Sequence, residues 1–306
     1  MTVDEVFKKF QKYNKARNLS NNTIKYYKTN CQRFKSFLKE KSIKYISDVN
    51  LNVIEDFTIQ LQSIIDNATS INTILRAIRT FLNYSAKMNY SNKVEVIMLK
   101  EEKKIKPTYT DKEIKLLLKK PKLKKCGFGE YRNWVMVNWL LSTGNRARTI
   151  RNIKIKDLDF EGGYIKLRKT KNKHQQLIPM GNKLSKILTE YLQYRNGNSD
   201  DYLFPNIYDD KLSTSSLGTA IRRYNLKRGV TKTSTHLFRH TFAKKYIKNG
   251  GDMFRLQKIL GHKSLDMVRE YVNMFSDDLK EGFEKYNPLN EFTSIKEKIK
   301  MNKGDE

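Results

Sequence analysis

Two short segments of the sequence place a basic side chain where it could meet an anion. In the first, Thr143-Gly144-Asn145-Arg146 follows an apolar run, and a glycine that ends a helix lets the next arginine project toward an anion. In the second, Lys171 lies in a polar stretch, 170–173, that is expected to form a hairpin turn. A lysine there could enter a DNA groove or, if desolvated, donate a proton. Either residue alone is also what an ordinary solvated surface presents.

Two further segments supply histidines and a tyrosine. On a helix that begins near Thr235, His236, Arg239 and His240 share one face. Leu260-Gly261-His262 is followed, nine residues after the histidine, by Tyr271. Two histidines separated by an arginine, with no nearby carboxylate, do not make a metal site. The same face suits a phosphate, whereas Tyr271 by itself is most simply a half-buried ring with its hydroxyl at the surface.

The spacing of apolar residues predicts the elements that position these groups. In residues 1–99, four apolar stripes at helical spacing predict a small bundle of four amphipathic helices. Residues 100–109 have no apolar period, contain a proline and carry a run of charges, which is typical of a linker.

A second domain is expected over residues 110–288. Helices are predicted from 110, over 134–141 and again from 183 onward. Between them, short alternating segments at 153–155, 164–168 and 175–180 predict an antiparallel sheet of about three strands. The predicted fold class is therefore mainly α with a small antiparallel β-sheet. The lysine-rich tail, 289–306, is expected either to dock on a neighbouring protomer or to fray.

The composition narrows the class of partner. Among 306 residues there are 61 Lys and Arg against 32 Asp and Glu, a net charge of +29. This excess favours a polyanion such as nucleic acid, the alternative being solubility or a coding bias toward lysine. No apolar run reaches the roughly 18 residues of a membrane span, and the start does not resemble a signal peptide. Cys31 and Cys126 alone cannot form a disulfide framework or a zinc site, so a reducing cytoplasmic setting without a metal is expected.

Taken together, the four segments resemble the tyrosine recombinase (phage integrase) family. The family's Thr-Gly-x-Arg matches 143–146, and its hairpin lysine, eight residues before a proline, matches Lys171 before Pro179. Its His-x-x-Arg-His matches 236–240, and its Leu-Gly-His with a tyrosine nine residues later matches 260–262 and Tyr271. Residues 19–27 and 71–79 resemble typical sequence motifs of the family's helical core-binding domain. The resemblance covers roughly residues 3–288.

The resemblance implies a site-specific DNA recombinase with a core-binding (SAM-like) N-terminal domain and a mixed α/β catalytic domain. Its nucleophile would be Tyr271, which would attack a DNA phosphodiester and form a covalent 3′-phosphotyrosine. The resemblance further implies that Arg146 and Arg239 stabilise the phosphate and that Lys171 protonates the leaving 5′ oxygen. His236 would assist proton transfer from Tyr271, and His262 would hold a phosphate oxygen or the geometry of the site. His240 would support the site without reacting. No ATP, metal or other cofactor is implied.

The sequence departs from the family pattern at a few positions. Thr149 stands where the family often has an acidic residue that supports the site. Phe238 replaces a common leucine, and Arg148 and Arg151 are additional charges. None of the six expected catalytic residues is missing.

The implied partner is duplex DNA at a specific site, bound by a homotetramer in synapsis. The residues predicted to contact DNA are Lys25, Lys28, Arg76, Arg79 and Lys173. Two alternatives share the fold: a catalytically inactive DNA-binding protein, and a type IB topoisomerase-like enzyme that relaxes one duplex. An unrelated RNA-binding role would explain the charge but not the motifs. With only about 100 residues before the catalytic domain, no separate arm-type DNA-binding domain is expected. The layout therefore favours a compact Xer-like or mobile-element recombinase associated with the nucleoid.

Overall fold

The computed structural model describes residues 1–102, 107–168, 176–262, 264–269, 283 and 287–289. The chain divides into two compact units, Met1–Lys104 and Ile105–Glu306, each with a hydrophobic core of its own. None of the helices in the described ranges is both long enough and apolar enough to cross a membrane.

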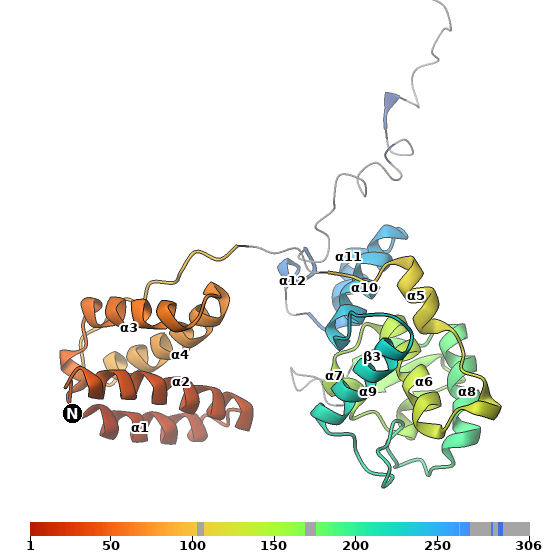
Figure 1. Ribbon diagram of the computed structural model, residues 1–306, viewed down its shortest axis with the longest axis horizontal. Coiled ribbons are helices and arrows are strands. Elements are labelled where there is room, and N and C mark those ends of the chain that lie inside the picture. The colour runs from red at the N-terminus through yellow and green to blue at the C-terminus, as the bar shows by residue number, and fades with distance from the viewer. Residues whose placement is uncertain (103–106, 169–175, 263, 270–282, 284–286, 290–306) are drawn as a thin grey trace, which may run out of the picture. The chain divides into compact units, whose positions relative to one another are not determined.

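Four helices make up most of the N-terminal unit (Figure 1). They are α1 (Val3–Ala16), α2 (Asn21–Glu40), α3 (Leu51–Ile64) and α4 (Ala68–Lys87), with a 3-10 turn at Ile46–Asp48. Each α-helix begins where a polar side chain accepts a main-chain N–H of the first turn, which satisfies one of its free donors. These capping residues are Thr2, Ser20, Asn50 and Asn67.

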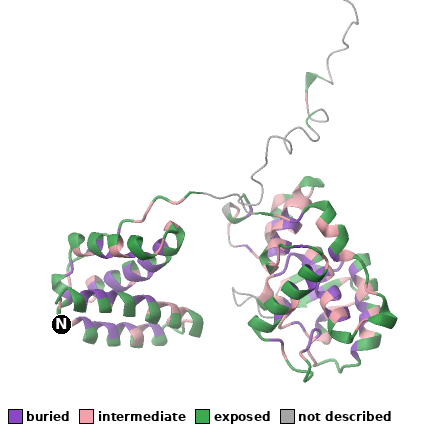
Figure 2. Ribbon diagram, in the orientation of Figure 1, coloured by how far each residue is buried: buried purple, intermediate pink, exposed green. Residues whose placement is uncertain are grey.

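The apolar stripes of these helices meet in one core. Figure 2 shows the buried face of each helix turned toward its neighbours and the exposed face turned to solvent. Phe34 and Phe57 pack edge to face at 4.9 Å between ring centroids, and Phe10 and Phe81 pack at 5.4 Å. The predicted N-terminal bundle is confirmed.

The C-terminal unit is built around one buried helix, α6 (Phe128–Thr143), which packs mainly against helices on several sides. These are α5 (Asp111–Leu118), α8 (Asn182–Arg195), α9 (Thr214–Lys227) and α10 (Thr235–Lys248). The remaining helices are α7 (Ala147–Ile150), α11 (Met253–Leu260), α12 (Asp266–Arg269) and 3-10 turns at Leu123–Lys125 and Ile155–Asp157. Since α6 is apolar on nearly every side, it forms the rigid centre from which the site is held.

A three-stranded antiparallel sheet with order β1-β2-β3 completes this unit. Its strands are β1 (Leu158–Asp159), β2 (Tyr164–Leu167) and β3 (Gln176–Pro179). Ile165 of β2 is paired with Ile178 of β3, and both are fully buried, so the register is set by one apolar face. The predicted fold class, mainly α with a small antiparallel sheet, is confirmed.

One predicted strand of the sheet is wrong. Ile153 and Ile155 alternate with Lys154, but they do not join β2. The carbonyl of Ile153 accepts the N–H of Leu203, and the N–H of Ile155 donates to Asp201, in an isolated bridge with the chain after α8. The Asp157 carboxylate then accepts the Lys154 N–H and closes a 3-10 turn. The local alternation reflects this distant pairing, which a short-range pattern cannot reveal.

Candidate active site

The first functional segment begins where α6 ends at a glycine. Gly144 is the C-cap, with φ at +59°, and its N–H donates to the carbonyl of Leu140 at 3.0 Å. A Cβ at this position would lie 2.5 Å from Cδ1 of Phe242 and 2.8 Å from Cδ2 of Leu260. Glycine is therefore needed both for the left-handed backbone and for the close approach of α10 and α11. The turn places Arg146 at the start of α7.

Arg239 is the buried centre of the site. Its helix, α10, begins at the Ser234 cap, and the neighbouring Phe238 packs into the core. The Arg239 side chain is held by two main-chain acceptors, with Nη1 donating to the Gly144 carbonyl and Nη2 to the Leu260 carbonyl, both at 2.9 Å. Arg146 reaches the same Leu260 carbonyl through Nη1 at 3.4 Å. The two motif arginines are thus brought together at the end of α11.

His262 joins this group directly after α11. The helix ends at Gly261, with φ at +63°, and the His262 N–H then donates to the carbonyl of Gln257 at 3.0 Å. The imidazole is buried, and its Nε2 contacts Nη2 of Arg239. Because a guanidinium has only donors, Nε2 of His262 must be the acceptor in this contact. His262 therefore helps to hold the Arg239 side chain.

His236 lies within the electrostatic reach of both arginines. The residue is exposed at the surface, but partial desolvation of its imidazole lowers the pKa below the ordinary 6.5, and the charges of Arg239 and Arg146 lower the pKa further. A lowered pKa leaves the ring neutral near pH 7, and so able to accept a proton. His240, one turn later on α10, is half-buried.

The described residues thus place four members of the expected catalytic set, Arg146, His236, Arg239 and His262. Lys171 and Tyr271 lie outside the described residues, as do Lys173 and the tail, 290–306. Within the described ranges, no three His, Cys, Asp or Glu residues gather in a way that could hold a metal ion.

Two contributors to the site were not predicted from the sequence. The carbonyl of Leu260 accepts from both arginines, and the Gln176 amide of β3 donates to the two preceding carbonyls of α11, those of Lys258 and Ile259. Main-chain acceptors carry no sequence signal. A single glutamine at the start of a strand resembles any other polar strand residue, so nothing in the pattern marked it.

The departures near Arg146 have distinct structural outcomes. Arg151 is engaged within the protein, since it donates to the Leu212 carbonyl and to Oγ1 of Thr214, both at 2.5 Å. Arg148 is exposed. Thr149 lines a small cavity of about 130 Å³ together with Asp157 and Arg168. The buried Asp157 carboxylate accepts from Nε of Arg168, so an acidic group is supplied to this region from a different position in the chain.

The N-terminal unit presents the predicted basic residues on α2 and α4. Lys25, Lys28, Arg76 and Arg79 are all exposed. The Tyr26 hydroxyl of α2 donates to the Thr73 carbonyl of α4 at 2.5 Å and so links the two helices that carry these basic residues. Arg76 differs from the others because it forms an ion pair with Glu101 at 2.8 Å.

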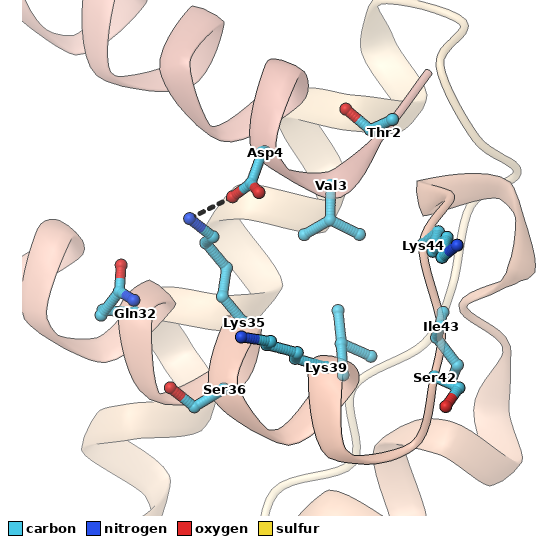
Figure 3. Close-up of a pocket in the computed structure, with 11 residues that line it drawn as sticks. Thr2, Val3, Asp4, Gln32, Lys35, Ser36, Lys39, Ser42, Ile43 and Lys44 are labelled. Atoms are coloured by element: carbon cyan, nitrogen blue, oxygen red, sulfur yellow. Dashed lines mark ion pairs between the residues drawn. The ribbon is translucent and has the colours of Figure 1, made fainter.

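A hollow of about 500 Å³ lies in the N-terminal unit, between the start of α1, the end of α2 and residues 42–44 (Figure 3). Lys35 pairs with Asp4 at its wall, and Lys39 and Lys44 also line it. It offers cations to an anion, but none of the residues predicted for catalysis lines it. The hollow is therefore separate from the residues that meet at the end of α11.

The sequence is similar to known protein families. The phage integrase family matches residues 107–277, and the phage integrase N-terminal SAM-like domain matches residues 7–88. A tyrosine recombinase XerD from Staphylococcus epidermidis is 26% identical over 296 residues, which cover 94% of this chain and 99% of the relative.

Solved structures share the fold. A Tn1549 transposon integrase in complex with transposon right end DNA aligns with a TM-score of 0.71 at 20% identity, over 94% of this chain and 100% of that chain. A lambda integrase tetramer bound to a Holliday junction aligns with a TM-score of 0.72 at 17% identity, over 89% of this chain and 77% of that chain. With a family match that spans more than half of its residues, the chain belongs to the phage integrase family.

Proposed function

We propose that this protein is a site-specific DNA recombinase that cleaves and rejoins duplex DNA through a covalent 3′-phosphotyrosine on Tyr271. The observation that carries the proposal is the convergence of Arg146 and Arg239 on the Leu260 carbonyl, with His262 against Arg239. This arrangement unites three of the four motif segments at one point. Membership of the phage integrase family and the similarity to a tyrosine recombinase XerD support the same function.

The arginines suit the charge that develops during attack on a phosphodiester. Each guanidinium presents five N–H donors, and the bonds described above leave donors of Arg146 available for non-bridging oxygens. Within the described ranges, Arg146 forms no ion pair with a carboxylate that would neutralise it. Cations held in place in this way stabilise the transition state without having to reorganise. One such donor typically increases the reaction rate by about 10²–10³-fold.

Proton transfer completes the reaction. The Tyr271 oxygen forms a bond to phosphorus, and its proton passes to the neutral His236 imidazole, whose lowered pKa suits a base at neutral pH. The bond from phosphorus to the 5′ oxygen breaks, and this oxygen takes a proton from Lys171. The phosphotyrosine conserves the bond energy, so the reverse attack by a 5′ hydroxyl rejoins the strand without ATP.

We also propose that each unit contributes cationic surface to duplex DNA, residues 1–99 as the core-binding domain and 110–288 as the catalytic domain. Exposed Lys25, Lys28 and Arg79 of the N-terminal unit would contact phosphates. A tetramer in synapsis is proposed because the related lambda integrase is a tetramer on a Holliday junction. A protein with this activity would act in the cytoplasm at the nucleoid.

The decisive experiment is covalent trapping on a nicked suicide substrate. The wild-type protein should form an adduct, and Tyr271→Phe should bind the same DNA with unchanged affinity and form none. Adducts formed by Tyr271→Phe would overturn the assignment of the nucleophile. Absence of adducts with the wild-type protein on its own site would favour the inactive DNA-binding alternative.

The reaction products distinguish a recombinase from the topoisomerase-like alternative. A recombinase should join two duplexes and give four-way junctions and exchanged strands, whereas a relaxing enzyme should only remove supercoils from one plasmid. Sequencing the DNA that remains attached to Tyr271 would give the target site and the position of cleavage together.

A further inference from the structure

Gln176 joins the β2–β3 hairpin to α11 among the residues that the structure describes. Its Nε2 donates to the carbonyl of Ile259 at 3.0 Å and to the carbonyl of Lys258. Gln176 pairs with Leu167 in the last described rung of the hairpin. The glutamine therefore lies at the point where β3 begins, next to the segment that contains Lys171.

The acceptors of this contact belong to a helix end that the site depends on. The last carbonyls of an α-helix have no partner within the helix and must find donors elsewhere. At the end of α11, the Lys258 carbonyl accepts the N–H of the Gly261 cap and also Nε2 of Gln176, and this Nε2 donates to the Ile259 carbonyl as well. The Leu260 carbonyl accepts from Arg146 and Arg239. The hairpin and both arginines thus donate to three successive carbonyls at this helix end.

The fit around the contact is close. Gly261 ends α11, and a Cβ at this position would lie 3.0 Å from Oε1 of Gln176, so a larger residue would press on the amide. On the opposite arm, Arg168 of the hairpin donates to the buried Asp157 carboxylate. Arg168 and Gln176, which flank the segment that contains Lys171 in the sequence, are thus both bound to other parts of the unit.

We propose that Gln176 is a positioning residue for protonation of the leaving group. By binding the carbonyls of Lys258 and Ile259, it fixes the hairpin that bears Lys171 to the helix end that holds the arginines. The inference rests on the proposed recombinase function and on the proposed acid role of Lys171. Neither the family motifs nor the relatives' names assign a role to this glutamine.

Three variants test the proposal. Gln176→Glu keeps the shape of the side chain but replaces the donating amide by a carboxylate that repels the two carbonyls. Gln176→Arg restores donors at the same position. Leu177→Ala is the matched control, because Leu177 is the next residue of β3 and its side chain is directed to solvent, with 61% of the residue exposed. Thermal melts of each variant show whether the fold is kept.

The readout compares two substrates at the same site. One has the natural 5′ oxygen at the scissile bond, and the other has sulfur there, which leaves as a thiolate and needs no proton. We expect Gln176→Glu to form adducts about 10²-fold more slowly on the oxygen substrate, as a displaced acid would. On the sulfur substrate its rate should equal that of the wild type. Gln176→Arg should recover the oxygen rate, and Leu177→Ala should match the wild type on both.

The possible results separate this inference from the proposed function. If Gln176→Glu cleaves the oxygen substrate at the wild-type rate, Gln176 does not position the site. If its rate falls equally on both substrates, the glutamine acts on the arginines and not on the acid, and the proposal is wrong. If the wild-type protein forms no adduct on either substrate, the recombinase assignment itself fails, and this inference fails with it.

Discussion

Arg146 and Arg239 donate to one and the same acceptor, the main-chain carbonyl of Leu260, at 3.4 and 2.9 Å. Arg146 caps the start of α7 and Arg239 lies in α10, so their mutual position is fixed by a third element, α11. The difference in their burial has a consequence. Arg239 is buried and also holds the Gly144 carbonyl, whereas Arg146 is half-buried and makes one long bond.

We therefore expect the two arginines to differ in their effect on stability. Arg239→Ala should lower the free energy of unfolding by about 1–3 kcal/mol for each buried carbonyl left without a donor. Arg146→Ala should leave the denaturation midpoint nearly unchanged. Both should reduce the cleavage rate by about 10²–10³. Urea denaturation and single-turnover adduct formation measure the two effects, and equal loss of stability in both variants would contradict the description of Arg239 as the buried centre.

The pKa of His236 predicts the acid side of the pH profile. A base must be unprotonated to act, so the rate should fall as the pH decreases through the pKa of His236. Burial and the two arginines lower this pKa, so the midpoint should lie below 6.5. Arg146→Ala removes one of the lowering charges and should move the pKa upward. The chain has 4 histidines, so an NMR titration of the imidazole C–H signals can follow the pKa of His236 directly. An unchanged pKa in Arg146→Ala would show that the charge of Arg146 does not act on His236.

Gly144 should tolerate no side chain. Gly144→Ala combines a left-handed backbone with a Cβ that would overlap Phe242 and Leu260, and overpacking of this kind typically costs about 1–3 kcal/mol. Gly163 is the matched control, because its φ is +68° but a Cβ added there would meet nothing within 4 Å. Gly163→Ala should therefore cost only the backbone strain, roughly 1–2 kcal/mol, and keep full activity. Equal melting temperatures for the two variants would show that the contact between α6, α10 and α11 is less close than described.

Binding of DNA should weaken steeply with salt, and the basic residues of the N-terminal unit should contribute unequally. Arg79→Ala should reduce the slope of log K against log salt by about 0.9, as expected for one lost phosphate contact. Arg76 already pairs with Glu101, so Arg76→Ala should change the slope less. Fluorescence anisotropy over a range of salt concentrations tests both, and a flat response of the wild-type protein would remove the electrostatic part of the proposal.

The sequence predicted the parts of this molecule that depend on local periodicity and on motif spacing. The four N-terminal helices, the glycine end of α6 and the histidine face of α10 follow from apolar stripes, helical spacing and a left-handed glycine. What the sequence could not predict depends on partners distant in the chain. The pairing of Ile153 with Leu203 produced an alternation that imitated a strand of the sheet.

The same limit applies within the site. The motifs identified Arg146 and Arg239, but not the acceptor that brings them together, since a main-chain carbonyl like that of Leu260 exists at every residue of every chain. The sequence showed Arg151 only as an additional charge near the motif, and its guanidinium proves to donate to the Leu212 carbonyl and to Thr214. An arginine can be solvated, structural or ligand-binding. Only its neighbours in three dimensions distinguish these cases, and the sequence pattern does not contain them.

The end of α11 also affects how the protein can vary. Its acceptors are the carbonyls of residues 258–260, so exchanging Lys258 for alanine would remove a side chain and leave its carbonyl in place. An alanine scan of α11 would therefore pass over these carbonyl contacts without detecting them. The residue at position 258 could therefore change while the geometry persisted. A change to a donor, such as Gln176→Glu, or one that displaces the helix end, such as a substitution of Gly261, would expose the dependence.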